Sequence, residues 1–311
     1  MKNKTHIFIA GALVISSLVA SLFAVMPLSA KSDTNRGEEW MKSINGDTPI
    51  ISLSIPGSHD AGATHSFVDL SGKCQDLSIQ DQLKAGVRFF DIRLKQKEAG
   101  LIVVHGFVEQ DLLFSDVLST FSSFLKTHTS EGLIVSVKKE AEGLRPISTF
   151  DEALKNSLLP YSSIWNTSGI LPETLKELRG KIFLVSRYEQ STIGLNAYEG
   201  WLDPKEASEK NTFDIETSNL HIQDHYKIKD IEDKKKEIAE CFEFSKNNKE
   251  VLTLNFASCY YVNAYPPTYA GSSAVEINGW ITEQIKNQSN LGVIVADFVT
   301  SSLCEAIYSR N

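Results

Sequence analysis

Short apolar runs rich in β-branched residues recur along the chain, and segments with helical spacing separate most of them. Residues 101–104 and 292–296 are apolar at nearly every position, which is typical of parallel strands buried on both faces. Every such run is short enough to be a strand. We therefore predict eight strands, at residues 50–55, 87–93, 101–105, 133–138, 181–186, 220–223, 251–256 and 292–297.

Helical spacing is clearest in two of the intervening segments. Val117, Phe121 and Leu125 recur at helical spacing, and so do Ile231, Ile238 and Phe242 in the charged segment 230–247. We also predict helices at 272–288 and 300–310, and a solvated helix face for the charge run 232–237. Strands that mostly alternate with helices over about 280 residues favour an α/β fold, a single (β/α)8 TIM-type barrel. A doubly wound open sheet is the alternative, but no glycine-rich loop follows the first strand.

The first thirty residues have a different pattern. Lys2 and Lys4 precede an apolar run over residues 7–26, which ends in small residues before Lys31. This order is typical of a secretory signal peptide. We predict that residues 1–30 are a signal peptide, that residues 31–311 form one domain, and that the protein is secreted and extracellular. The run is long enough to span a bilayer, so an uncleaved anchor is the alternative.

Composition and charge narrow the range of partners. The 311 residues are 42% hydrophobic and 23% charged, as in folded globular proteins, with a net charge of −8. Removal of residues 1–30 takes away two lysines and no acidic residue, which leaves a net charge of −10. This balance argues against nucleic acid as a partner and against general electrostatic attraction to anionic lipid. We expect a monomer.

The cysteines leave two alternatives open. Cys74, Cys241, Cys259 and Cys304 fit no zinc spacing such as C-x-x-C. Secretion would permit disulfides, but a chain of this size does not need them. Four free buried thiols and one bridge among the three C-terminal cysteines are both compatible with the sequence.

Ionisable residues stand at seven of the eight predicted strand ends. In a (β/α)8 barrel the carboxyl ends of the strands form the functional face. We therefore expect one site at this face, built from the strand-end residues His59, Asp60, Arg93, His105, Lys138, Arg187, Asp224 and Asp297.

Two histidines with an arginine between them in sequence indicate acid–base chemistry on a phosphoryl group. One imidazole can accept a proton from an attacking hydroxyl while the other donates a proton to the leaving oxygen. Arg93 has a planar fork of donors that suits phosphate oxygens. Barrel closure places the last strand beside the first, so Asp297 can orient His59.

Seven sequence runs resemble those of the bacterial phosphatidylinositol-specific phospholipases C. They occur in the family's order from about residue 38 to the C-terminus, and the first two together are specific. The runs are SIPGSHDAGA, GVRFFDIRLK, VVHG, VSVKKE, RGKIFLVSRY, IQDHYK and GVIVADF. The resemblance implies an irregular (β/α)8 barrel that is secreted and needs no metal or other cofactor. It further implies a phosphatidylinositol diacylglycerol-lyase that acts on phosphatidylinositol in membranes, and in some members on glycosylphosphatidylinositol anchors.

The resemblance also implies catalytic roles. His59, held by Asp297, would take the proton of the inositol 2-hydroxyl, whose oxygen then attacks phosphorus to give inositol 1,2-cyclic phosphate. His105, paired with Asp60, would protonate the departing diacylglycerol oxygen. Arg93 would neutralise the charge on phosphorus.

Further positions carry supporting roles by the same resemblance. Lys138, Arg187 and Asp224 would hydrogen-bond the inositol hydroxyls, and Tyr226 would lie against the ring. Asp91 would contact the catalytic side chains and not the substrate. A fixed cation at Arg93 occupies the place where eukaryotic relatives carry calcium ligands, so we expect no metal site.

The sequence departs from the family pattern at three single positions and in the loops that are expected to face the membrane. Val104, Ser186 and His225 replace a histidine and two lysines of the family. No tryptophan occurs in residues 67–77, where the family carries apolar side chains for membrane contact. The loop after the seventh strand keeps aromatic residues, so we expect weak, transient lipid contact through Tyr260, Tyr261, Tyr265 and Tyr269.

Two other functions remain as alternatives. A metal-dependent phosphodiesterase acting on glycerophosphodiesters or sphingomyelin would need acidic ligands near the first two strand ends, where Arg93 stands. A non-catalytic inositol or glycan binder would have no need for both His59 and His105.

Overall fold

The computed structural model describes residues 36–66, 72–98, 100–141, 148–201, 203, 211–262 and 271–311. The predicted signal peptide lies outside these residues, as do Tyr265 and Tyr269. Among the helices of the described residues, none is both long and apolar enough to cross a bilayer.

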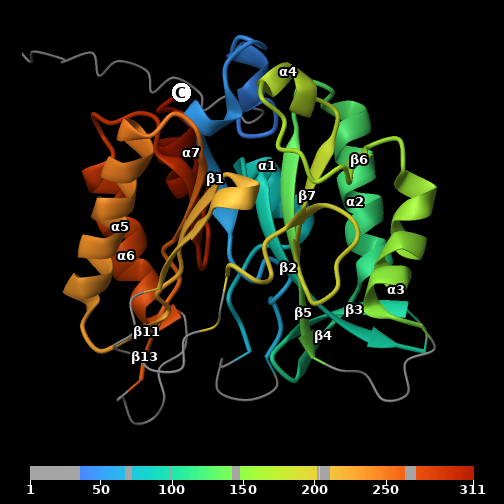
Figure 1. Cartoon of the computed structure of the whole chain (residues 1–311). Coiled ribbons are helices and arrows are strands. Elements are labelled where there is room, and N and C mark those ends of the chain that lie inside the picture. Colours follow the sequence, from blue (N-terminus) through green and yellow to red (C-terminus); the bar gives the residue numbers. More distant parts are fainter. Residues whose placement is uncertain are drawn as a thin grey trace, which may run out of the picture. The chain divides into compact units, whose positions relative to one another are not determined.

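The strands and helices alternate along most of the described chain (Figure 1). The strands are β1 (Ser54–Ser58), β2 (Phe89–Lys97), β3 (Gly100–His105), β4 (Val108–Leu113), β5 (Leu133–Ala141), β6 (Trp165–Asn166), β7 (Ile182–Arg187), β8 (Leu195–Asn196), β9 (Thr212–Ile215), β10 (Leu220–Gln223), β11 (Lys227–Ile228), β12 (Leu252–Phe256), β13 (Tyr260–Tyr261) and β14 (Gly292–Ala296). The α-helices are α1 (Ile79–Ala85), α2 (Phe114–Thr127), α3 (Phe150–Leu158), α4 (Leu175–Leu178), α5 (Ile231–Asn247), α6 (Gly271–Gln284) and α7 (Ser301–Tyr308). Short 3-10 helices are η1 (Trp40–Ser43), η2 (Ile50–Ser52), η3 (Leu159–Tyr161) and η4 (Glu216–Ser218).

One curled sheet carries the site. Its strands follow the order β6-β7-β5-β2-β1-β14-β12-β10-β9, and all neighbouring pairs in this path are parallel except β10 with β9. Among the described residues no strand pair joins β6 to β9, so the barrel is irregular and incompletely closed. The helices α2 and α3 lie on one side of these strands in Figure 1, and α5, α6 and α7 on the other. The predicted α/β barrel class is confirmed.

Burial explains why the strands read as continuous apolar runs. Every residue of β1, β7, β12 and β14 is buried, because side chains on one face fill the barrel and those on the other pack against helices. The four predicted helical segments are helices in the structure, α2, α5, α6 and α7. The side chains of Asp230 and Thr300 accept backbone N–H groups at the starts of α5 and α7.

The predicted meeting of the first and last strands is confirmed. The strand β1 pairs with β14 from Ser54 opposite Gly292 to Ser58 opposite Ala296. On its other edge β1 pairs with β2, with Ser58 opposite Phe90. The residues that follow β1 and β14 therefore emerge side by side.

One predicted barrel strand has a different role. Residues 101–105 fall in β3, which runs antiparallel to β2 and forms a hairpin with β4. The parallel set instead includes the two-residue β6 beside β7. The run is apolar because β3 packs against α2 and α3. An apolar run of this kind shows that a strand is buried, but not the direction in which it runs.

The prediction that the charge run 232–237 is a solvated helix face is wrong in part. Lys234 is fully buried and donates a hydrogen bond to Oε1 of Gln223 at 2.9 Å. Glu237 lies 2.8 Å from the ring of His225. Polar side chains of the helix α5 therefore contact the end of β10. The charged sequence of this helix did not indicate these buried contacts.

Candidate active site

The strand ends open into a cavity of about 940 Å³. Its lining contains most of the predicted site residues together with several that the sequence did not indicate. The lining residues are His59, Cys74, Arg93, His105, Lys138, Lys139, Glu140, Arg187, Tyr198, Glu199, Trp201, Asp203, Asp224, Tyr226, Ser258, Cys259, Tyr260 and Asp297. Cavities of this size accommodate a small organic ligand.

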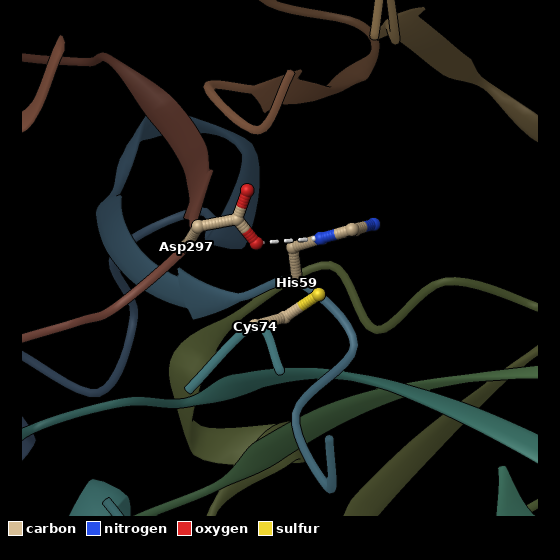
Figure 2. A group of neighbouring side chains, drawn as sticks. All are labelled: His59, Cys74 and Asp297. Carbon is tan, nitrogen blue, oxygen red and sulfur yellow. Dashed lines mark hydrogen bonds and ion pairs between the residues drawn. The ribbon is translucent and has the colours of Figure 1, made fainter. Parts of the chain in front are cut away.

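The ring of His59 is held between a carboxylate and a guanidinium group. Its Nδ1 lies 2.7 Å from Oδ1 of Asp297, a contact drawn in Figure 2, and its Nε2 lies 2.8 Å from NH2 of Arg93. Burial and the charge of Arg93 would lower the pKa of His59, but the carboxylates of Asp297 and Asp60 together outweigh them and the pKa is raised above its ordinary value. The neighbouring main chain is held by Gln75, whose amide donates to the carbonyl of His59 at 2.8 Å.

Arg93 is surrounded by carboxylates. Its Nε lies 3.2 Å from Oδ2 of both Asp60 and Asp91, and NH1 lies 3.3 Å from Oε1 of Glu140. Burial would lower the pKa of Arg93, yet these acids raise it well above its ordinary value. The guanidinium is therefore a fixed positive charge on the cavity wall.

His105 reaches the same cluster from the β3–β4 hairpin. Its Nε2 lies 3.6 Å from Oδ2 of Asp60, which is buried at 1% exposure. Asp60 directly follows His59 and has a left-handed backbone, with φ of 42°. The two histidines are thus connected in space through Arg93 and Asp60.

A second group of polar side chains lies farther along the cavity. Lys138 contacts Oε2 of Glu140 at 3.1 Å, and Arg187 lies 3.6 Å from Oδ2 of Asp224. Tyr226 also lines the cavity. Burial, with help from nearby acids, raises the pKa of its hydroxyl, which therefore stays protonated at neutral pH.

The structure adds residues that sequence reasoning missed. Asp203 pairs with both Lys138, at 3.2 Å, and Arg187, at 3.1 Å. The ring of Trp201 lies 3.8 Å beneath the Arg187 guanidinium, and its Nε1 donates to Asp224 at 2.8 Å. Neither residue stands at a strand end, so strand-end position could not have identified them. Glu140 could have been found, because it lies two residues after Lys138 and so on the same side of β5.

The four cysteines are all free and buried. The alternative of a bridge among the three C-terminal cysteines is therefore not realised. Cys74 and Cys259 line the cavity, whereas Cys304 is buried near Arg88.

Three replaced family positions take up local structural roles. Val104 is fully buried. The hydroxyl of Ser186 donates to the carbonyl of Ile193 at 2.6 Å, and His225 is buried against Glu237. Of the tyrosines expected at the rim, Tyr260 lines the cavity, and its ring centroid lies 6.0 Å from that of Tyr226.

Known proteins resemble this chain in sequence and fold. Residues 47–188 match the family "Phosphatidylinositol-specific phospholipase C, X domain". A 1-phosphatidylinositol phosphodiesterase of Listeria monocytogenes is 27% identical over 288 residues, which cover 88% of this chain and 85% of the relative. One of Staphylococcus aureus is 28% identical over 284 residues, with 84% and 88% covered. The solved structure of a Staphylococcus aureus phosphatidylinositol-specific phospholipase C variant superimposes with a TM-score of 0.76 at 25% identity, covering 89% of this chain and 99% of that one.

The fold and the strand-end site thus define the class as a barrel enzyme of the phosphodiesterase type. The chain is similar to the phosphatidylinositol-specific phospholipases C, whose X domain residues 47–188 match. The resemblance found in the sequence is confirmed, and it extends over most of the chain.

Proposed function

We propose that the protein is a phosphatidylinositol diacylglycerol-lyase that releases diacylglycerol and inositol 1,2-cyclic phosphate. A single observation carries the proposal: an unbroken series of contacts joins Asp297, His59, Arg93, Asp60 and His105 around one side of the cavity. This series supplies a base, an acid and a cation within reach of one phosphodiester.

The proposed reaction follows from these positions. Nε2 of His59 takes the proton of the inositol 2-hydroxyl while that oxygen forms a bond to phosphorus. The bond from phosphorus to the diacylglycerol oxygen breaks, and His105 gives its proton to that oxygen. His59 ends protonated and His105 neutral. Water can then open the cyclic product with the two roles exchanged.

Arg93 takes up the negative charge that develops on the phosphoryl oxygens. Its NH2 group also lies 2.8 Å from Nε2 of His59. A bound phosphoryl group competes for the same donors and frees the histidine to accept a proton. Asp297 then stabilises the imidazolium that forms.

The inositol ring fits the second group of side chains. Lys138, Arg187 and Asp224 offer donors and an acceptor for its hydroxyls, and Tyr226 offers a flat apolar surface. Asp203 and Trp201 hold the two cations and Asp224 in place. The ring would thus be bound among these side chains, with its phosphoryl group toward Arg93.

We propose that the reaction needs no metal. Asp60, Asp91 and Glu140 could otherwise ligate a hard cation such as Ca²⁺, but the Arg93 guanidinium lies among them. Full activity in excess chelator is the expected result. Activity that only calcium restores would favour the metal-dependent alternative.

Secretion and weak membrane contact complete the proposal. The basic and apolar pattern of residues 1–30 supports export of a barrel formed by residues 31–311. Tyr260 at the cavity supports a shallow contact with lipid, which Tyr261, Tyr265 and Tyr269 would extend. We propose that the enzyme acts as a monomer.

The decisive experiment follows phosphatidylinositol by 31P NMR in the presence of chelator. We expect a cyclic phosphodiester product from the native protein. His59→Ala and His105→Ala should each lower the rate by roughly 10²–10⁴ or more. His65→Ala is the matched control, because this histidine does not line the cavity. Binding of the lipid without turnover would instead indicate a non-catalytic inositol binder.

A further inference from the structure

Cys74 places a thiol between the two histidines of the site. Its Sγ falls within 4.8 Å of ligand atoms of His59 and Asp297, and equally of ligand atoms of Asp60 and His105. Figure 2 shows the sulfur beside His59 and Asp297. Neither the proposed reaction nor the proposed inositol contacts use this thiol.

The main chain holds Cys74 firmly in this position. Its N–H donates to the carbonyl of Ala63 at 2.8 Å, and its carbonyl accepts the N–H of Phe298 at 2.8 Å. These residues belong to the turns after β1 and β14. The sulfur is thus tied to both strand ends that carry the candidate catalytic groups.

Of the two groups that share the sulfur, the one with Asp60 and His105 is better suited to a cation. His59 already has both ring nitrogens engaged, by Asp297 and Arg93. In contrast, Nε2 of His105 lies 3.6 Å from Oδ2 of Asp60, too far for a hydrogen bond. Ligand atoms around tetrahedral zinc lie about 3.3–3.8 Å apart, given the usual zinc–ligand bond lengths.

Asp60 is a second, independent indication. Its side chain is 1% exposed, and neither of its carboxylate oxygens accepts a hydrogen bond. It has only charge contacts, with Arg93 and His105. A buried carboxylate with unused lone pairs costs free energy that a bound cation would recover.

The surroundings do not exclude a divalent cation. Asp60, Asp91, Glu140 and Asp297 together outnumber the nearby charges of Arg93 and Lys138. A hard cation would need several oxygens, but Oδ2 of Asp60, Oδ2 of Asp91 and Oε1 of Glu140 all lie within 3.3 Å of Arg93, whereas Oδ1 of Asp60 is buried without a hydrogen bond. A soft cation needs only one carboxylate beside a thiolate and an imidazole.

We propose that Asp60, Cys74 and His105 form a binding site for a thiophilic divalent cation of the Zn²⁺ class. The sulfur binds as the thiolate, with its proton released to solvent, and the cavity leaves room for a fourth ligand from water. A cation held here removes the imidazole of His105 from reaction. The binding stands by itself, whereas its inhibitory effect rests on the proposed function.

Cadmium is the direct probe, because a cadmium–thiolate bond has an ultraviolet charge-transfer absorption. Titration of the native protein should give a band that saturates at one equivalent. Cys74→Ser should abolish it, and Cys304→Ser, a buried free thiol elsewhere, should keep it. His105→Ala should weaken binding by at least about tenfold, the smallest loss typical even for outer partners of a metal. His59→Ala should leave it intact.

The activity measurement separates the two proposals. Zn²⁺ should inhibit phosphatidylinositol cleavage reversibly in the native enzyme and Cys304→Ser, but not in Cys74→Ser, and Ca²⁺ should have no effect. Absence of the cadmium band, or an unchanged band in Cys74→Ser, overturns the metal site. A band without any lipid cleavage contradicts the proposed function instead. If Cys74→Ser fails to fold, Cys74→Ala provides the same comparison with an apolar side chain.

Discussion

NH2 of Arg93 lies 2.8 Å from Nε2 of His59, so the residue proposed to bind the phosphoryl group also contacts the proposed base. Only the planar guanidinium can make this contact while Nε also reaches Asp60 and Asp91. The same group thus organises the base, two acids and the anion site.

We predict that Arg93→Lys lowers kcat by roughly 10²–10³, because a single ammonium cannot replace several directed donors to the developing charge. Steady-state cleavage of phosphatidylinositol measures the effect. Lys126→Arg, an exposed change on α2, is the control and should be silent. A kcat for Arg93→Lys near the native value would contradict the role given to the guanidinium.

The His59–Asp297 contact predicts a change in pH dependence. The carboxylate raises the pKa of His59, so its removal in Asp297→Asn should lower that pKa. Because a base must be neutral, the acid limb of the kcat/KM profile should move to lower pH. The maximal rate should nevertheless fall, since the imidazolium loses its partner. An acid limb that stays in place would show that His59 is not the group that titrates.

Trp201 is predicted to position the inositol-binding side chains. Trp201→Phe keeps a ring beneath Arg187 but removes the N–H that holds Asp224. We expect KM to rise several-fold with kcat little changed. Trp165→Phe is a matched control, because its Nε1 is buried without a hydrogen-bond partner. A fall in kcat at constant KM would place Trp201 in the chemical step instead.

Two acids, the partly buried Glu140 and the buried Asp151, predict how stability depends on pH. Arg93 and Lys138 outweigh burial and lower the pKa of Glu140 to about 2, and contacts with Lys155 and Thr192 do the same for Asp151. Both folded pKa values lie below the ordinary ones of 4.5 and 3.8, so these groups stabilise the fold at neutral pH. Their contribution should be lost as pH falls from about 5 to about 2.

Denaturant unfolding across this range tests the prediction. Glu140→Gln should flatten the dependence of the free energy of unfolding on pH, while the exposed Glu283→Gln should not. If the two variants show the same pH dependence, the Glu140 contacts do not contribute as their distances imply.

The sequence was sufficient to predict the barrel and the meeting of its first and last strands. The spacing of apolar residues shows where the strands are. Residues that follow the strands meet at one face of the barrel, which is why Asp297 and His59 could be paired. Direction is not encoded in an apolar run, so β3 could not be recognised as antiparallel. Side chains on irregular segments, such as Trp201 and Asp203, obey no period and required the structure.

Lys234 shows a second limit of sequence analysis. A lysine within a charged helical segment is ordinarily solvated. Its burial depends on Gln223, a residue of β10 that lies eleven positions earlier in the chain. A buried partner of this kind becomes visible only when helix and strand are placed together.

Phe107, between β3 and β4, predicts a contact with the lipid surface. Its side chain is 91% exposed, although it lies only two residues after His105 in the cavity wall. Exposure of a phenylalanine at this turn favours shallow insertion beside the proposed catalytic site. Phe107→Ser should therefore reduce cleavage of vesicle-bound phosphatidylinositol several-fold while leaving hydrolysis of soluble inositol 1,2-cyclic phosphate unchanged. Ile170→Ser, which is 75% exposed but does not line the cavity, is the control. Equal losses on both substrates would instead assign Phe107 to the structure of the hairpin that carries His105.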